Sequence, residues 1–208
     1  QSLELFRRFK HRWTTGRDVA CLVYFARQMM EQAGTIGGFF EATFDPNQDM
    51  AFALERFTDL ALALDHGGIY RGKKLPRKAG VRYFFPSPAG GGACKRLNLY
   101  LRWMVRPKDE VDLGQWNFVP TSSLVIPLDT HISRIGQHLG WTGRKTPGWK
   151  MAMDITRTLA LVDPEDPTKF EFALSRMGIL ENCPRHPKRS DCDLCKLRRQ
   201  TKVAPTSA

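Results

Sequence analysis

The stretch IPLDTHISRIGQHLGW, residues 126–141, is the part of the sequence that decides the fold. Its apolar side chains Ile132, Ile135 and Leu139 recur at the spacing of one helix face, which predicts that this face is buried. Asp129 stands directly before them, where a helix N-cap belongs and where aspartate is a preferred residue. The stretch therefore predicts an amphipathic helix that begins just after Asp129.

Asp129 has two interpretations. Pro127 restricts the chain before it, and the carboxylate can accept hydrogen bonds from the amides of Thr130 and His131, which would hold it ionised. That position suits a catalytic carboxylate. A purely structural N-cap is at least as common, so both interpretations stay open. His131 itself is interpreted as a surface or interface residue.

Helical spacing of apolar residues continues through most of the chain and predicts an all-α fold without strands. Cap signals at Thr146-Pro147 and Asp166-Pro167 announce two of the helices. The expected helical segments are two apolar stripes through Leu5–Trp13 and Leu22–Met30, and helices near 49–64, 93–106, 130–139, 147–161 and 167–178.

Irregular connectors divide this helical chain into two lobes and a tail. We expect a first lobe at 1–125 with a glycine-rich, hairpin-like loop and a central helix, a second lobe at 126–182, and a basic tail with cysteines at 183–208. Since the chain opens on Gln1 directly in an amphipathic pattern, we also expect further helices upstream of it.

The charge of the chain points to a polyanionic partner. Its 208 residues carry a formal net charge of +11, which favours nucleic acid or an anionic membrane surface. Between His66 and Lys108 there is no Asp or Glu, and an acid-free block of this length favours phosphate contact over the alternative of a solvated basic surface. The block holds eleven basic residues: Arg71, Lys73, Lys74, Arg77, Lys78, Arg82, Lys95, Arg96, Arg102, Arg106 and Lys108.

Two classes of protein are not indicated. No apolar run approaches the roughly 18 residues of a membrane span. Five cysteines, three of them clustered near the end, do not resemble a secreted disulfide framework, so we expect a cytoplasmic protein.

The connector PSPAGGGACK, residues 86–95, places glycines before a lysine in the first turn of the expected central helix. Backbone amides of such a loop can approach a phosphate closely. Lys95, partly desolvated among other cations, would have a lowered pKa and act as an amine nucleophile. The alternative is that Lys95 is one more phosphate-contacting cation.

The stretch 126–141 resembles the aspartate-bearing segment of the helix-hairpin-helix–GPD superfamily of DNA glycosylases, which includes endonuclease III. The combination of GGACKRLNLYLRWMVR, DLGQW and IPLDTH is still more similar to a bacterial family of unknown function within that superfamily, over about residues 1–180. Two features depart from the superfamily: the hairpin signature LPGVGxKTA is absent, and Lys95 and Asp129 are further apart than in endonuclease III. The longer separation is similar to that of the archaeal 8-oxoguanine glycosylases.

The resemblance implies a two-lobed glycosylase-like fold and base-excision chemistry. Lys95 would be the nucleophile that attacks C1′ of a flipped, damaged nucleotide such as 8-oxoguanine, and Asp129 the carboxylate that stabilises charge on the sugar. A Schiff base formed this way would permit strand cleavage, that is, AP lyase activity. The alternatives are a non-catalytic nucleic-acid-binding protein that keeps this fold, and a protein-interaction module for an acidic partner.

The expected partner is double-stranded DNA, bound by a monomer without membrane contact. For the aromatic residues Phe84, Phe85, Trp103 and Trp116, core packing is favoured over stacking on an extruded base. The residues expected to contact DNA are Arg71, Lys73, Lys74, Arg77, Lys78, Gly90, Gly91, Gly92 and Arg96.

The cysteines near the end raise the question of a metal. Cys183, Cys192 and Cys195 resemble part of the superfamily's iron–sulfur loop, but Thr201 stands where its fourth cysteine would be. His186 could complete a Cys3His site for zinc or a degenerate cluster. A metal-free loop is the alternative, and the proposed chemistry needs no cofactor. Cys21 and Cys94 are expected to be packed thiols.

Overall fold

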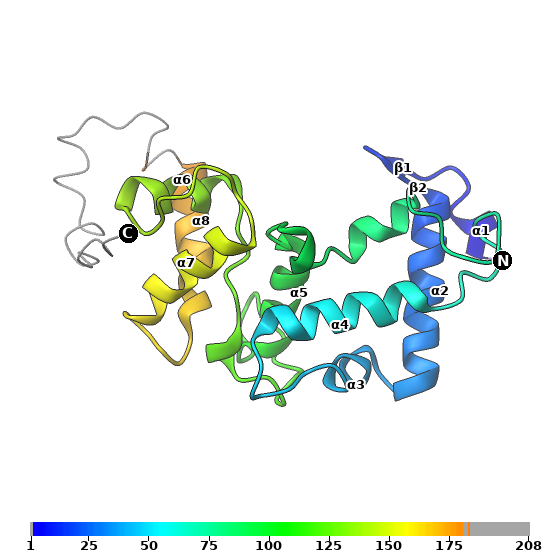
Figure 1. The fold of residues 1–208 in the computed structure, drawn as a ribbon, viewed down its shortest axis with the longest axis horizontal. Helices are drawn as coiled ribbons and strands as arrows, with labels where there is room; N and C mark the ends of the chain where they lie inside the picture. The colour runs from blue at the N-terminus through cyan, green and yellow to red at the C-terminus, as the bar shows by residue number, and fades with distance from the viewer. Residues whose placement is uncertain (1, 181–182, 184–208) are drawn as a thin grey trace. The chain divides into compact units, whose positions relative to one another are not determined.

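The computed structural model describes residues 2–180 and 183, and they form the all-α fold that the sequence predicts. Short 3-10 helices lie between the longer ones: η1 Gly80–Phe84, η2 Pro88–Gly90, η3 Thr121–Ser123 and η4 Pro167–Phe170. The α-helices are α1 Ser2–Leu5, α2 Gly16–Ala33, α3 Ile36–Glu41, α4 Met50–Ala63, α5 Lys95–Val105, α6 Thr130–Leu139, α7 Trp149–Ala160 and α8 Glu171–Ile179 (Figure 1).

A small β-ribbon corrects the prediction of a helix through Leu5–Trp13 without strands. Strand β1, Lys10–His11, pairs antiparallel with β2, Thr14–Thr15, and Arg12 takes a positive φ of 54° in the turn between them. Helices in proteins are stabilised mainly by burial of an apolar face. Trp13 stays 68% exposed, so this stripe lacks the burial that would hold it in a helix.

The contacts within the chain divide it between Gly90 and Gly91 into two compact units, called here unit 1 (residues 1–90) and unit 2 (from Gly91 on). The sequence instead predicted a boundary after residue 125. The difference arises from α5, because its buried Arg102 forms ion pairs with Asp112 and Glu171, both of which follow it in the chain. The expected central helix therefore belongs to the second unit.

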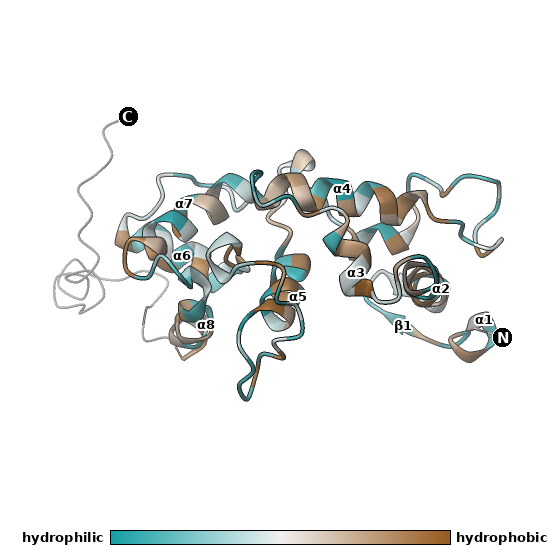
Figure 2. Cartoon of the chain, turned by 90° about the horizontal axis from the view of Figure 1, so that it is seen from below, coloured by the Kyte–Doolittle hydropathy of each residue, from teal (hydrophilic) through white to brown (hydrophobic). Residues whose placement is uncertain are grey.

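The core of unit 1 is aromatic. The ring centroid of Phe57 on α4 lies 5.4 Å from that of Phe40 on α3 and 6.0 Å from that of Phe85, which in turn lies 6.1 Å from Phe25 on α2. Asp49 caps α4 by accepting a hydrogen bond from the Phe52 amide, so the helix predicted near 49–64 is confirmed with its cap. Figure 2 shows the apolar and polar sides of α2 and α4.

Unit 2 packs α6 against α8 and α7, and the face of α6 that carries Ile132 and Ile135 is buried as predicted. The helix expected near 147–161 begins slightly later, at Trp149, with Gly148 rather than Thr146 as its N-cap. The segment expected near 167–178 is η4 followed directly by α8.

Candidate active site

Asp129 is the N-cap of α6, as predicted, but it caps a different amide. Its Oδ1 accepts a hydrogen bond from the Ile132 amide at 2.7 Å, rather than from Thr130 or His131. This three-residue reach is the usual N-cap geometry. The side chain is 12% exposed, so one carboxylate oxygen is fixed by the helix and the group remains accessible at one edge.

Lys95 lies beside this carboxylate. It is the first residue of α5, and its Nζ is 3.9 Å from Asp129 Oδ2. Both residues belong to unit 2, and the fold brings them together across the long connector between α5 and α6. The Lys95 side chain is 49% exposed, which is more open than the partly desolvated setting expected from the sequence.

Ser175 on α8 is a further member of the site. Its hydroxyl donates a hydrogen bond of 3.0 Å to Asp129 Oδ2, the same oxygen that faces Lys95. Sequence reasoning missed Ser175, because only the packing of α8 against α6 places it there. No motif in the sequence could have singled it out.

A buried network of ion pairs, which the sequence did not predict, lies near Lys95 and Asp129. Arg102 on α5 is within 3.2 Å of both Glu171 and Asp112, and Arg106 pairs with Asp112 and, at 2.8 Å, with Asp166. Burial raises the pKa of Glu171; Arg102 opposes that rise, and the nearby charge of Asp129 adds to it. Arg102 and Arg106, counted among the basic residues of the acid-free block, are thus committed to internal carboxylates.

The glycine-rich connector, residues 86–95, crosses from unit 1 into unit 2 and ends at Lys95. Gly91 has a φ of 74°, and its carbonyl accepts a hydrogen bond from the Trp149 amide at the start of α7. Cys94 is buried, as predicted, and takes a left-handed conformation just before Lys95. Gly91 and Gly92 are exposed, as is Arg96.

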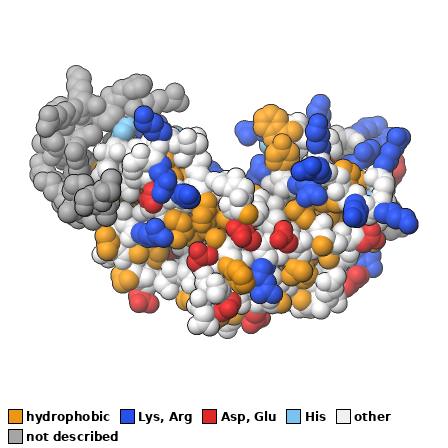
Figure 3. Space-filling view, viewed as in Figure 1, with side chains coloured by type: hydrophobic (Ala, Val, Ile, Leu, Met, Phe, Trp, Pro, Cys, Tyr) orange, Lys and Arg blue, Asp and Glu red, His pale blue; other side chains and the backbone are white. Residues whose placement is uncertain are grey.

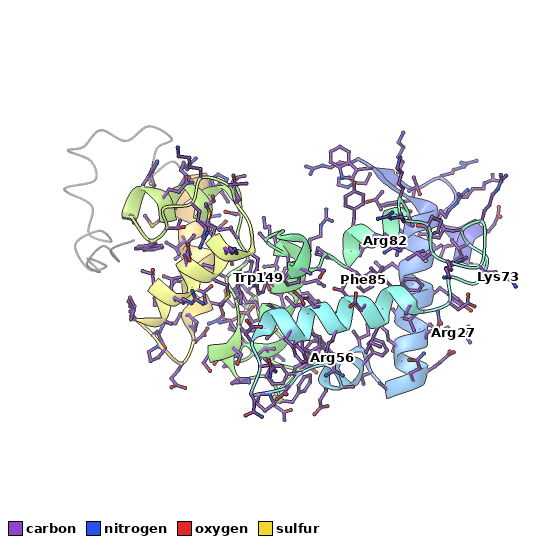
Figure 4. All side chains as sticks on the ribbon, in the orientation of Figure 1. Arg27, Arg56, Lys73, Arg82, Phe85 and Trp149 are labelled. Carbon is purple, nitrogen blue, oxygen red and sulfur yellow. The ribbon has the colours of Figure 1, made fainter. Side chains whose placement is uncertain are left out.

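The remaining basic residues expected to contact DNA belong to unit 1. They lie between α4 and η1, and all five are exposed: Arg71, Lys73, Lys74, Arg77 and Lys78. Figure 3 shows Lys and Arg side chains gathered over this part of unit 1, and Figure 4 labels Lys73 among them. Gly90, the last residue of η2, is also in unit 1.

Two of the four aromatic candidates pack in the core, whereas Phe84 is half-buried. Phe85 is 7% exposed, and Trp116 is 6% exposed with its ring 5.6 Å from Phe118. Trp103 is the more accessible, at 38%. Core packing, the favoured interpretation of this set, is confirmed for Phe85 and Trp116.

The expected metal ligands fall largely outside the described residues. His186, Cys192 and Cys195 are in the segment the structure does not describe. Cys183 Sγ lies 3.4 Å from Nδ1 of His138, which the sequence analysis did not consider. Within residues 2–180 and 183, no group of three or more His, Cys, Asp or Glu side chains is placed to hold a metal ion.

Comparison with known proteins defines the family. The chain matches the model of a protein family of unknown function, DUF2400, over residues 1–180, and it belongs to that family. Neither the curated proteins nor the solved structures contain a match to it. In the described part of the chain, no helix combines the length and apolarity that crossing a membrane requires.

Proposed function

We propose that this protein is a DNA glycosylase of base-excision repair, in which Lys95 is the nucleophile and Asp129 its carboxylate partner. The observation that carries the proposal is the juxtaposition of Lys95 Nζ and Asp129 Oδ2, 3.9 Å apart, with the carboxylate oriented by the start of α6 and by Ser175. The resemblance of both segments to the helix-hairpin-helix glycosylases supports the same assignment.

The reaction would begin with a damaged nucleotide extruded from the duplex. The neutral amine of Lys95 attacks C1′ while the bond to the base breaks, and the base departs with the electrons of that bond. Asp129 stabilises positive charge that develops on the sugar and accepts the proton that Lys95 loses. Opening of the sugar then leaves a Schiff base on Lys95, from which β-elimination of the 3′ phosphate cleaves the strand.

Borohydride trapping tests this proposal, because reduction converts the Schiff base into a stable protein–DNA adduct. The substrates in this experiment are DNA duplexes that carry 8-oxoguanine, uracil or an abasic site. We expect an adduct with the wild-type chain, none with Lys95→Ala, and little with Asp129→Asn. Asparagine is as good an N-cap as aspartate, so Asp129→Asn tests the charge rather than the stability of α6.

A matched control is Lys150→Ala, which removes another exposed lysine of unit 2, on α7. We expect this variant to form the adduct at the wild-type rate. An adduct that persists in Lys95→Ala would overturn the role of Lys95. Tight, salt-sensitive duplex binding without any adduct would favour the second candidate, a non-catalytic DNA-binding protein, which the exposed basic residues between α4 and η1 support.

A further inference from the structure

Unit 1 contains a groove of about 910 Å³ in which no residue of the Lys95–Asp129 site takes part. The groove is lined by the ribbon β1–β2, the segment before it, the start of α2, η1, and two residues of the loop before η1, Tyr70 and Lys78. Two kinds of side chain dominate its lining: the basic residues Arg7, Arg8, Lys10, Arg17 and Lys78 and the aromatic residues Phe9, Trp13, Tyr70 and Tyr83.

Four of the five basic side chains of the groove are available to a ligand. All five are exposed, and Arg7 pairs with Glu4 at the surface. Within the described part of the chain, the other four form no ion pair with a carboxylate. Asp18 also lines the groove, but it is only 4% exposed, and its carboxylate accepts hydrogen bonds from Thr15 and Tyr70. Its charge is therefore directed inward, and the groove presents a cationic surface.

Three of the four aromatic rings are exposed beside these cations, whereas Tyr70 is buried. Trp13 is 68% exposed and Phe9 45%, and Tyr83, which also lines the groove, is 54% exposed. Large rings are usually buried in the core, as Phe57 and Phe85 are in this same unit. Rings exposed in a cationic groove are the arrangement with which proteins bind unpaired nucleotides, since every base has a flat face that stacks on a ring.

We propose that this groove binds single-stranded nucleic acid, with phosphates against the basic side chains and unpaired bases stacked on Trp13 and Phe9. In a duplex the bases stack on one another, so their faces cannot reach these rings. An acidic peptide would satisfy the cations but has no flat partner for Trp13. The proposal is independent of Lys95 and of any bond-breaking step.

A smaller hollow of about 460 Å³ adjoins the groove and extends the proposed binding surface. It shares Lys78 and Tyr83 with the groove and adds Arg77, which is exposed. Arg82 also lines it, but its guanidinium donates to the carbonyls of Pro76 and Leu75 and so holds the preceding loop in shape. Lys78 thus lies where the single-stranded nucleic acid would pass from the groove into the smaller hollow.

The test is fluorescence anisotropy with the full chain and a labelled oligothymidylate of about 12 nucleotides, within the site sizes of other single-strand binders. We expect tighter binding of this strand than of a blunt duplex of equal length. Trp13→Ala should weaken single-strand binding roughly tenfold, the loss expected for one stacked base, with little change for duplex. Binding of the strand should weaken linearly when the logarithm of its affinity is plotted against the logarithm of the salt concentration. Arg17→Ala and Lys78→Ala should each make this slope shallower by about 0.7.

The matched controls come from α4 of the same unit. Phe52 and Arg56 form an exposed cation–ring pair, 5.4 Å from guanidinium carbon to ring centroid, and neither lines the groove. Figure 4 shows Arg56 on the opposite side of α4 from Arg82. Phe52→Ala and Arg56→Ala should leave oligothymidylate affinity unchanged, and Trp13→Phe should retain most of it.

Two results would overturn the proposal. One is unchanged single-strand affinity in a Trp13→Ala variant whose circular dichroism matches the wild type. The other is displacement of the oligothymidylate by polyglutamate, or by vesicles containing phosphatidylserine, as effectively as by unlabelled strand. Lys95→Ala should bind the strand normally, so failure of this proposal and failure of the glycosylase proposal would be distinguishable.

Discussion

At the scale of single residues, the oxygen Oδ2 of Asp129 is the atom on which the candidate chemistry depends. Oδ1 is committed to the Ile132 amide, whereas Oδ2 faces both Ser175 and Lys95. A hydroxyl that donates to this oxygen restricts the rotation of the carboxylate about its side-chain bond. In the proposed mechanism Ser175 is therefore a positioning residue, which would act on Lys95 through Asp129.

Ser175→Ala should slow borohydride trapping roughly tenfold, because a hydrogen bond to a charged group contributes about 1.5–3 kcal/mol. Binding of the same duplex should stay unchanged, since the substitution removes no cation. Ser175→Thr, which keeps the hydroxyl, should restore most of the rate. If Ser175→Ala forms the adduct as fast as the wild type, Ser175 has only a structural role.

Asp18 in unit 1 makes a pH-dependent contribution to stability. Burial by itself raises the pKa of Asp18, but hydrogen bonds from Tyr70, Thr15 and the Gly80 amide outweigh burial, and the pKa in the folded state is lowered from 3.8. The unfolded chain therefore binds the proton more readily. The stabilisation is fully present at pH values above the pKa of Asp18 in the unfolded chain. It is lost as the pH falls through the pKa of Asp18 in the folded state.

Urea unfolding of Asp18→Asn against the wild type checks this contribution. At neutral pH the variant should be less stable, and the difference should shrink as the pH falls below 3.8 and through the lowered pKa of the folded state. A difference of equal size at both pH values would mean that Asp18 stabilises the fold through packing rather than through its charge.

At the scale of elements, the contact between α6 and α8 is what carries Ser175 to Asp129. This contact is close at Gly178: a Cβ atom there would lie 2.4 Å from Cβ of His131. His131, interpreted from the sequence as a surface or interface residue, is instead half-buried and packs between these two helices. Glycine at 178 therefore sets how closely α8 approaches α6.

Gly178→Ala should destabilise the protein, although alanine is favoured over glycine by about 1 kcal/mol within a helix. Overpacking costs about 1–3 kcal/mol, and His131 cannot relieve the clash by rotating its ring because the clash is with its Cβ. Gly143→Ala, with no atom within 4 Å of the new methyl group, is the control and should change the melting temperature little. A stabilised Gly178→Ala variant would contradict this packing.

At the scale of the whole molecule, the division between the two units follows from where α5 makes its buried ion pairs. Arg102→Ala would leave Glu171 buried without a cation and Asp112 with Arg106 alone, a change that costs about 3–5 kcal/mol. Chemical denaturation should show this loss. Arg27→Ala removes an exposed pair with Glu31 and should have little effect, so equal losses in the two variants would contradict the importance of burial.

The sequence by itself determined the all-α class, the position of α4 to within a residue at each end, and the N-cap at Asp129, because apolar spacing and capping are local properties. It also singled out Lys95 and Asp129, through segments that resemble a known superfamily. The β-ribbon escaped it, since the stripe through Trp13 has helical spacing without the burial that would support a helix. Ser175, the network around Arg102 and the groove beside Trp13 were decided only by the tertiary structure, because each depends on packing between segments distant in the chain, which no local pattern encodes.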